Sequence, residues 1–303
     1  MIMSTILPRY PIFIPSKGRA DSVLTARCFR SDNVPFQLVV EPQELESYSA
    51  VWGRDHTLSL PDSHRGLVFA RNWIKSYSIS QGHERHWQLD DDIDDLYRLH
   101  RGRRIKMNAA IGLAIAEDFV DRYENVALAS LNDIKFLIAT YGYQKSSFPP
   151  FYLNSRCYTC FLVLNKIPYQ WRNRYNEDTD MTLQALAGGW CTILFNAVGM
   201  KSPATLSRPG GQMVSQTANY RGDGRLKMAR QLERVWPGVV TTMRRFKRAQ
   251  HTVKDNWQRF DTPLKKKDPP PPFRDYGLML DVLDASKAQD VLRHMNEKEG
   301  AKP

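Results

Sequence analysis

The stretch RHWQLDDD, at residues 85–92, is the feature from which the fold can be worked out. It joins a short segment of β-strand composition, with Trp87 and Leu89, directly to three consecutive aspartates. Asp94 and Asp95 follow, so five carboxylates fall within six positions of a chain whose formal net charge is +11. Acidic runs are most often solvated loops, and metal binding is the alternative. The sequence around the stretch decides between the two.

The residues upstream of this stretch alternate between short β-rich runs and helical runs. YPIFIP, FQLVVEP and HTLSLP have the composition of strands, and SVLTARCFR, QELESYSAV and GLVFARNWIKSYSIS have the character of helices. Repeated strand and helix units of this spacing indicate a parallel sheet with helices on its faces. We therefore expect an α/β fold with a mostly parallel sheet flanked by helices, in which RHWQLDDD is the fourth strand.

Polar residues follow three of these strands at the point where each strand ends. In open α/β sheets, ligands bind beyond the carboxyl ends of the strands. Alternate residues Asp90 and Asp92 project to the same side of an extended segment, and paired carboxylate oxygens suit Mg²⁺ or Mn²⁺. Such ions take the rest of their ligands from water and from a substrate diphosphate. The position of the acidic run thus favours a metal site over a solvated loop.

The second half of the sequence continues the alternation. A helix is expected within residues 107–125, a strand at 126–132, a pair of strands or one bent strand at 151–165, and a further strand at 191–198. NEDTDMTLQALAGG, at residues 176–189, predicts a helix with Asp178 or Thr179 near its N-cap and glycines at its end.

Beyond residue 202 the composition turns to Gly, Arg and Lys, and regular periodicity fades. LKKKDPPPPFR, at residues 264–274, is typical of a polyproline spacer, and residues 284–298 predict a short amphipathic helix. We expect a main domain at 1–260, with a nucleotide-sugar half at 1–100 and an acceptor half at 101–260. Residues 261–303 would form a Lys/Pro-rich linker and a C-terminal helix.

Several classes of protein are excluded by composition. No apolar run approaches the roughly 20 residues of a membrane span, and the N-terminus lacks the order of a signal peptide, so we expect the cytoplasm. Four cysteines are too few for a disulfide framework, and the lone CYTC is a poor zinc site, so buried thiols are expected. A pI near 9.5 permits an anionic partner.

The motifs, taken in order, resemble those of the GT-A glycosyltransferases. They are IPSKGRA after the first strand, ARN at residues 70–72, QLDDDI at the fourth strand and NED at residues 176–178, and together they cover residues 8–200. More narrowly, their spacing resembles the phage-type glycosyltransferases associated with TET-like dioxygenases, which modify 5-hydroxymethylcytosine in DNA. For a phage protein, the expected location becomes the host cytoplasm.

The resemblance implies a role for each matching position. Asp90 and Asp92 would hold Mn²⁺ or Mg²⁺, and the ED pair would supply the general base, with Asp178 preferred and Glu177 as the substitute. His251 is the one candidate for a late metal-binding histidine. The implied donor-binding residues are Pro15, Ser16, Lys17, Arg19, Glu41, Arg71, Asn72, Asp90 and Asp91.

Each of these residues also has a simpler interpretation. Glu177 and Asp178 are what a helix N-terminus favours, and Arg71 could belong to a solvated helix face. Lys17 and Arg19 could be surface charges in a turn. The ordered set carries the argument.

Two segments, at residues 100–106 and 243–267, are rich in Arg and Lys, and the second interleaves them with Phe246, Trp257 and Phe260, as nucleic-acid grooves do. Solvated helix faces are the alternative for each. A base flipped out of a duplex also needs aromatic walls, although core packing explains most aromatics. The candidate wall residues are Phe151, Tyr152, Tyr158, Trp171 and Tyr175, and the candidate DNA-binding residues are Arg103, Arg104, Arg244, Arg245, Lys247 and Arg248.

These features together predict a metal-dependent GT-A glycosyltransferase that uses a UDP-sugar and modifies 5-hydroxymethylcytosine in DNA. One alternative is a glycosyltransferase for a glycan or protein acceptor. The other is a noncatalytic DNA-binding protein on a GT-A scaffold, although the carboxylates would repel phosphate in a pure DNA binder.

Overall fold

The computed structural model describes residues 6–100, 103–137, 149–203, 224–245, 248–272, 274 and 276. The helices are α1 (Leu24–Ser31), α2 (Leu45–Trp52), α3 (Leu67–Ser80), α4 (Ala109–Val120), α5 (Glu177–Ala187) and α7 (Gly224–Val235). The strands are β1 (Ile12–Pro15), β2 (Gln37–Val40), β3 (Thr57–Ser59), β4 (Arg85–Leu89), β5 (Asp95–His100), β6 (Arg103–Met107), β7 (Val126–Asp133), β8 (Phe151–Leu153), β9 (Cys160–Leu164), β10 (Cys191–Lys201), β11 (Val240–Arg245) and β12 (Arg248–Val253).

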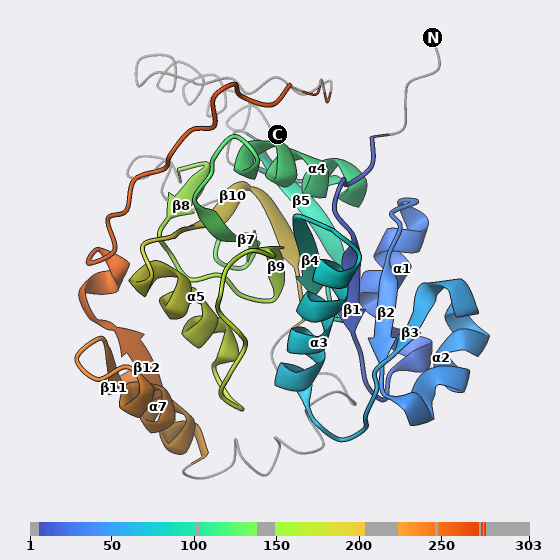
Figure 1. The fold of residues 1–303 in the computed structure, drawn as a ribbon, viewed down its shortest axis with the longest axis horizontal. Coiled ribbons are helices and arrows are strands. Elements are labelled where there is room, and N and C mark those ends of the chain that lie inside the picture. Colours follow the sequence, from blue (N-terminus) through green and yellow to red (C-terminus); the bar gives the residue numbers. More distant parts are fainter. Residues whose placement is uncertain are drawn as a thin grey trace, which may run out of the picture.

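One large sheet dominates the described part of the chain (Figure 1). Its strand order is β3-β2-β1-β4-β9-β7-β10-β5-β6, and β8 pairs with β10. β1, β2, β3 and β4 are parallel, as are β7 and β10, whereas β9 runs antiparallel between β4 and β7. Among the ten described strands of this sheet, pairing directions place seven in one orientation and β5, β8 and β9 in the other. The predicted mostly parallel α/β sheet is therefore confirmed.

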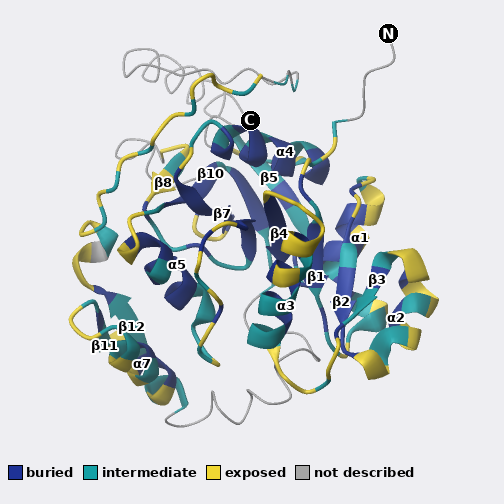
Figure 2. Ribbon diagram, in the orientation of Figure 1, coloured by how far each residue is buried: buried dark blue, intermediate teal, exposed yellow. Residues whose placement is uncertain are grey.

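Helices cover both faces of this sheet because successive side chains of each strand point to opposite sides. Ile12 and Ile14 pack in the cluster that contains residues of α1 and α4. Phe13, between them, packs with Ala70 and Ile74 of α3 on the other side. α5 adds residues to a further cluster with β7 and β9. Figure 2 shows the buried sheet, with α4 and α5 also largely buried and α2 more exposed.

Several local predictions are refined by the structure. Residues 151–165 form two separate strands, β8 and β9. α5 begins at Glu177 with Asn176 as its N-cap, so Asp178 and Thr179 lie in its first turn, near the N-cap as expected. Asn176 has a φ of 55°, and its side chain donates to the carbonyl of Met228 instead of capping the helix. All four cysteines are buried free thiols, as expected.

A C-terminal unit, formed by α7 and the β11–β12 hairpin, packs against α5. Leu183 of α5 shares an apolar cluster with Leu232, Val240 and Val253 of this unit. Figure 1 shows the unit beside α5 at the edge of the molecule.

The chain then returns along the main domain. Lys266 forms a β-bridge with Tyr123, and the Glu124 N–H donates to the Lys265 carbonyl at 2.9 Å. Residues 262–267 are therefore held against the domain, and the expected boundary at residue 260 stays a prediction. The predicted helix at 284–298 lies outside the described residues. Among the helices of the described part, none combines the length and apolar character of a membrane span.

Candidate functional site

The loop after β1 is bound to the end of β4 through Asp91. Ser16 Oγ donates to Asp91 Oδ2 at 2.6 Å, and the Arg19 guanidinium forms an ion pair with the same carboxylate. The Asp91 carbonyl accepts the Leu24 N–H at 3.0 Å, at the start of α1. Asp91 is 6% exposed. Its side chain thus joins the first and fourth strand ends from within the protein.

A second set of contacts fixes the loop that follows β2. Glu41 is buried, and its carboxylate accepts Lys17 Nζ at 2.6 Å, Gln43 Nε2 at 2.7 Å and the His64 N–H at 2.9 Å. Burial alone would raise the pKa of Glu41, but these three donors lower it below its usual value. Lys17 itself remains partly exposed. Pro15, Ser16, Lys17, Arg19 and Glu41 therefore meet at the carboxyl edge of the sheet.

Arg71 of α3 reaches this edge from the interior. Its Nη2 atom donates to Asp90 Oδ1 at 2.8 Å, and the residue is 1% exposed. The guanidinium carbon lies 4.7 Å from the ring centroid of Trp171 and 5.2 Å from that of Phe161. This aromatic packing compensates a buried cation for the loss of water. Arg71 therefore lies on the interior side of Asp90. The Asp90 side chain itself remains 36% exposed.

Asn72, the neighbour of Arg71, has a different set of partners. Its Nδ2 donates to the Trp171 carbonyl, and its Oδ1 accepts the Trp171 N–H, both at 2.8 Å. The amide thus holds the segment that carries Trp171 over Arg71. The structure gives Asn72 a supporting role beside its expected contact with the donor.

The ED pair at the start of α5 lies within electrostatic range of Asp90 and Arg71. Burial raises the pKa of Glu177 to about 7; Asp178 also raises it and Arg71 lowers it. Burial likewise raises the pKa of Asp90 to about 7, with Arg71 opposing and Asp92 and Glu177 reinforcing the shift. The fold thus gathers the Arg71, Asp90 and Glu177 positions into one site.

Asp178 has a different environment from its neighbour. Its carboxylate forms an ion pair with Arg156, and Oδ1 accepts the Thr179 N–H at 2.7 Å. Burial alone would raise the pKa of Asp178, but Arg156, the Thr179 N–H and His251 hold it below its usual value. Arg156 was missed by the sequence analysis because no motif marks an arginine in the loop between β8 and β9.

His251 of β12 lies beside the ED pair. Its Nε2 atom is 3.3 Å from Thr179 Oγ1. Burial and the Arg156 charge lower the pKa of His251 to about 4, with Asp178 opposing the shift. The residue considered for a third metal ligand is therefore a neighbour of Asp178.

Asp90 and Asp92 are the residues that fit a divalent cation. Among the described residues, no three His, Cys, Asp or Glu side chains form a group that could hold a metal ion. Asp92 raises the pKa of Asp90, so the two carboxylates repel each other, and a cation between them would relieve that repulsion. Asp91 is turned inward to Ser16 and Arg19. Two carboxylates fit an ion that takes its other ligands from water and a diphosphate.

The predicted DNA-binding residues fall on two parts of the structure. Arg103 and Arg104 lie on β6, at the end of the strand order, and Arg104 Nη2 donates to the Leu137 carbonyl at 2.7 Å. Arg244, Arg245 and Arg248 are exposed at one end of the paired strands β11 and β12. Lys247 lies outside the described residues.

The aromatic residues proposed for the acceptor side are partly structural. Trp171 is buried against Arg71, and Phe151 packs beside Phe119 at a centroid distance of 4.8 Å. The Tyr158 hydroxyl donates to Asn132 and accepts the Asp133 N–H. Tyr152 is 37% exposed. Core packing accounts for Trp171 and Phe151, as the alternative interpretation expected.

Comparison with known proteins gives one family match. The model of the TET-associated glycosyltransferase family matches residues 10–211. No curated protein sequence matches the chain. Among solved structures, the chain is similar to a putative nucleotide-diphospho-sugar transferase from Desulfovibrio desulfuricans G20, with 10% identity and a TM-score of 0.37. That match covers 76% of this chain and 99% of the other. The matched family region includes every site residue from Pro15 to Asp178, whereas α7, β11 and β12 lie beyond it.

Proposed function

The chain belongs to the TET-associated glycosyltransferase family and is a glycosyltransferase, and from this we propose that it transfers a sugar from a UDP-sugar to 5-hydroxymethylcytosine in DNA. One observation carries the proposal. Arg71, Asp90 and Glu177 are far apart in sequence, yet the charges of Arg71 and Glu177 shift the pKa of Asp90, and Arg71 shifts that of Glu177. A residue proposed for donor binding, Asp90, and one proposed to activate the acceptor, Glu177, therefore lie in one site.

The donor half of the proposal rests on the loops after β1, β2 and β4. Lys17 and Arg19 supply positive charge for a diphosphate, and their partners Glu41 and Asp91 hold them in place. Asp90 and Asp92 would hold Mn²⁺ or Mg²⁺. When bound, such an ion supplies electrostatic stabilisation of the diphosphate as it leaves. The hydrogen bond from buried Arg71 keeps the Asp90 carboxylate in one orientation.

The contacts of the ED pair support Glu177 as the general base in preference to Asp178. A base must be free to accept a proton, and Asp178 is committed to Arg156 and to the Thr179 N–H. Glu177 has a raised pKa, which makes its carboxylate a stronger base near neutral pH. Glu177 is therefore the preferred base, whereas the motif alone implies Asp178.

The proposed reaction is a single displacement. The hydroxymethyl oxygen of the acceptor forms a bond to the anomeric carbon of the sugar, while the bond from that carbon to the diphosphate oxygen breaks. Glu177 takes the hydroxyl proton, and the nucleoside diphosphate leaves with the electron pair of the broken bond. Attack opposite to the leaving group inverts the anomeric configuration.

A labelling experiment tests the proposal. The protein is incubated with Mn²⁺, radiolabelled UDP-glucose and matched duplexes that carry cytosine or 5-hydroxymethylcytosine. Label only on the modified duplex is the expected result. A panel of donors, read by mass spectrometry of the digested nucleosides, then identifies the sugar. Absence of label with every donor would overturn the DNA acceptor, whereas release of nucleotide without DNA would leave sugar transfer standing.

The metal requirement is tested separately. Exchange of Asp92 for Ala should abolish Mn²⁺-dependent binding of the UDP-sugar, because a single carboxylate would remain for the ion. Salt-sensitive binding of DNA should persist, since Asp92 contributes no positive charge. Donor binding that is the same with Mn²⁺ and with a chelator would overturn the metal assignment.

A further inference from the structure

The C-terminal unit of α7, β11 and β12 is fastened to the first turn of α5, which carries the ED pair. Asn176 Nδ2 donates to the Met228 carbonyl at 3.1 Å, and Trp236 Nε1 donates to Asp180 Oδ1 at 2.7 Å. His251 and Thr179 make the third polar contact, at 3.3 Å. Asp180 is fully buried, so its bond to Trp236 is strengthened by low dielectric. The unit is thus anchored to the helical turn that carries Glu177.

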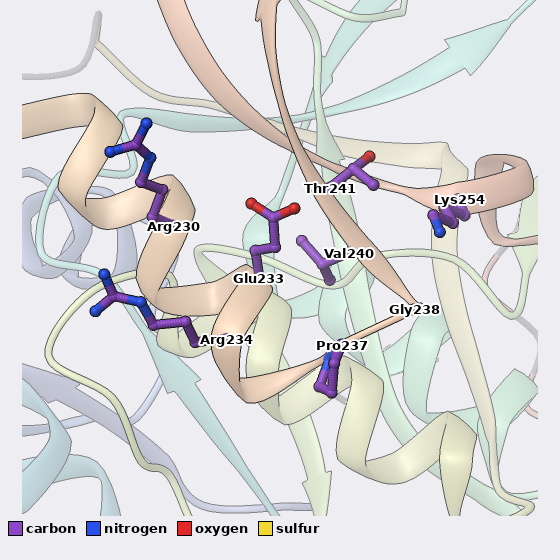
Figure 3. A pocket seen from close by; sticks show the side chains of 8 residues that line it. All are labelled: Arg230, Glu233, Arg234, Pro237, Gly238, Val240, Thr241 and Lys254. Carbon is purple, nitrogen blue, oxygen red and sulfur yellow. The ribbon is translucent and has the colours of Figure 1, made fainter.

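An open hollow lies on the same unit, between α7 and β11 (Figure 3). Its volume is about 440 Å³, and Arg230, Arg234 and Lys254 contribute three cationic side chains to its lining. All three residues are exposed. Glu233 is the one carboxylate among the lining residues. The hollow therefore carries a net positive charge.

The geometry of the hollow suits a phosphodiester backbone. Arg230 and Arg234 are four residues apart and so lie on one side of α7, where two guanidinium groups can hold neighbouring phosphates. Thr241 supplies a hydroxyl group, and Gly238, with a φ of 76°, lets the main chain turn without a side chain at the rim. Lys254 adds a point charge on the other side of the hollow.

Further cationic residues lie on the same two-stranded sheet as Val240 and Thr241. Arg244, Arg245 and Arg248 are exposed at the end of the β11–β12 pairing, where Arg245 lies opposite Arg248. Several cations on one unit suit a polymer of phosphates, because a single small anion would need fewer of them. The occupant that fits is a nucleic-acid strand.

The arginines of the hollow lie a short way along the α7 axis from the contact with Asn176. Met228 contacts Asn176, and Arg230 and Arg234 lie two and six residues further along α7. At a rise of 1.5 Å per residue, these positions are about 3 and 9 Å along the helix axis. The major groove of B-DNA is about 12 Å wide. A strand held in the hollow can therefore accompany a target base presented near Glu177.

We propose that the hollow of Arg230, Arg234 and Lys254 is a docking site for the phosphate backbone of the acceptor DNA, placed on a unit outside the matched family region. The proposal rests on the proposed function for the identity of the polymer. The unit would bind the DNA backbone. Its contacts with Asn176, Asp180 and Thr179 would hold the bound backbone in a fixed position relative to α5.

Charge-reversed variants of the full-length protein test the docking site. Binding of a fluorescent duplex with 5-hydroxymethylcytosine is measured by anisotropy over a range of salt concentrations. Arg230→Glu combined with Arg234→Glu should lower the affinity by about tenfold or more and reduce the slope of log K against log salt by about 2. Glu233→Gln should have the opposite sign and tighten binding, because it removes the one carboxylate of the hollow. Thermal unfolding checks that each variant is folded.

A matched control carries the same change of charge elsewhere. Arg27→Glu combined with Arg54→Glu alters two exposed arginines of the nucleotide-sugar half and should change the affinity much less. If the Arg230 and Arg234 variant binds the duplex as tightly as the wild type, or if the control weakens binding equally, the docking site is overturned. These outcomes do not depend on sugar transfer. A wild-type protein that binds DNA through the hollow but transfers no sugar would overturn the proposed function and leave the docking site standing.

Discussion

Glu177 and Asp178 are adjacent carboxylates with opposite electrostatic environments. Burial raises the pKa of Glu177 to about 7, whereas the ion pair with Arg156 holds the pKa of Asp178 below its usual value. A single helical turn thus presents one carboxyl group that can exchange a proton near neutral pH and one that stays ionised. The difference leads to predictions for catalysis and for its pH dependence.

Exchange of Glu177 for Gln should lower kcat by about 10²- to 10⁴-fold, the range expected for loss of a general base. Asp178→Asn should have a smaller effect, because Asn keeps an acceptor for the Thr179 N–H and loses only the charge that faces Arg156. Initial rates at saturating donor and duplex measure both. A larger loss in the Asp178 variant would move the base to Asp178.

Transfer should depend on pH in the direction set by Glu177. Because the base must be ionised, kcat/KM should rise as the pH increases through about 7, and Glu177→Gln should lack this rise. Profiles of kcat/KM against pH for the two proteins measure the effect. A rise of equal size in the variant would assign it to another group.

The same group should affect stability with the opposite sign. A raised pKa means that the folded protein binds the Glu177 proton more tightly than the unfolded chain does. The contribution to stability is present below the ordinary pKa of Glu and is lost as the pH rises through about 7. Between about pH 5 and pH 8, the unfolding midpoint of the wild type should therefore fall relative to that of Glu177→Gln.

Arg71 should act on donor binding through Asp90. Arg71→Met keeps an apolar stem between Trp171 and Phe161 but removes the ion pair, and should weaken Mn²⁺-dependent binding of UDP-sugar by about 10- to 100-fold. Lys75→Met is the matched control on α3: Lys75 is also buried, but its Nζ donates to the Ile167 and Tyr169 carbonyls. Calorimetric titration that finds both variants equally impaired would reduce the role of Arg71 to packing.

The contact between Trp236 and Asp180 should contribute to the stability of the whole protein. Trp236→Phe removes a hydrogen bond to a buried carboxylate and should cost about 1.5 to 3 kcal/mol of unfolding free energy, measured in urea. Trp190→Phe, at the other end of α5, serves as the control. Two separate unfolding transitions in the wild type would show that the C-terminal unit folds independently of α5.

Asn125 should hold the segment after residue 260 to the main domain. Its Nδ2 donates to the Pro263 carbonyl and its Oδ1 accepts the Lys265 N–H, each at 2.9 Å. Asn125→Ala should destabilise the protein by about 1 to 3 kcal/mol, because both bonds are lost. Lys265→Ala keeps the backbone bond and should be nearly neutral. An unchanged unfolding midpoint in the Asn125 variant would support a loose linker from residue 261.

The parallel half of the fold was predictable because its signals are local. β1, β2 and β4 are short apolar runs, and the polar residues that follow them meet where parallel strands end. The β5–β6 hairpin was missed because Arg103, Arg104 and Lys106 gave it the composition of a basic surface segment. All three residues are exposed on β6, an edge strand, where charge is tolerated.

The supporting residues that no motif marks are recognisable only through their contacts in the folded protein. Arg156 acquires a role only through Asp178, and Asp180 only through Arg172 and Trp236. The burial of Arg71 likewise depends on Trp171, which is a hundred residues away. Motifs locate the groups that face a substrate, whereas the groups that orient them are fixed by tertiary packing.

The two ends of the described chain meet on α4. Arg274 donates to the Leu7 carbonyl at 3.1 Å and pairs with Asp118, and the Arg9 N–H donates to the neighbouring Glu117 at 2.7 Å. α4 ends where β7 begins, so this meeting point lies at the amino edge of the sheet, opposite the strand ends that carry Asp90 and Ser16. Immobilisation of the enzyme on a support through either segment would therefore leave the reacting groups turned toward the solution.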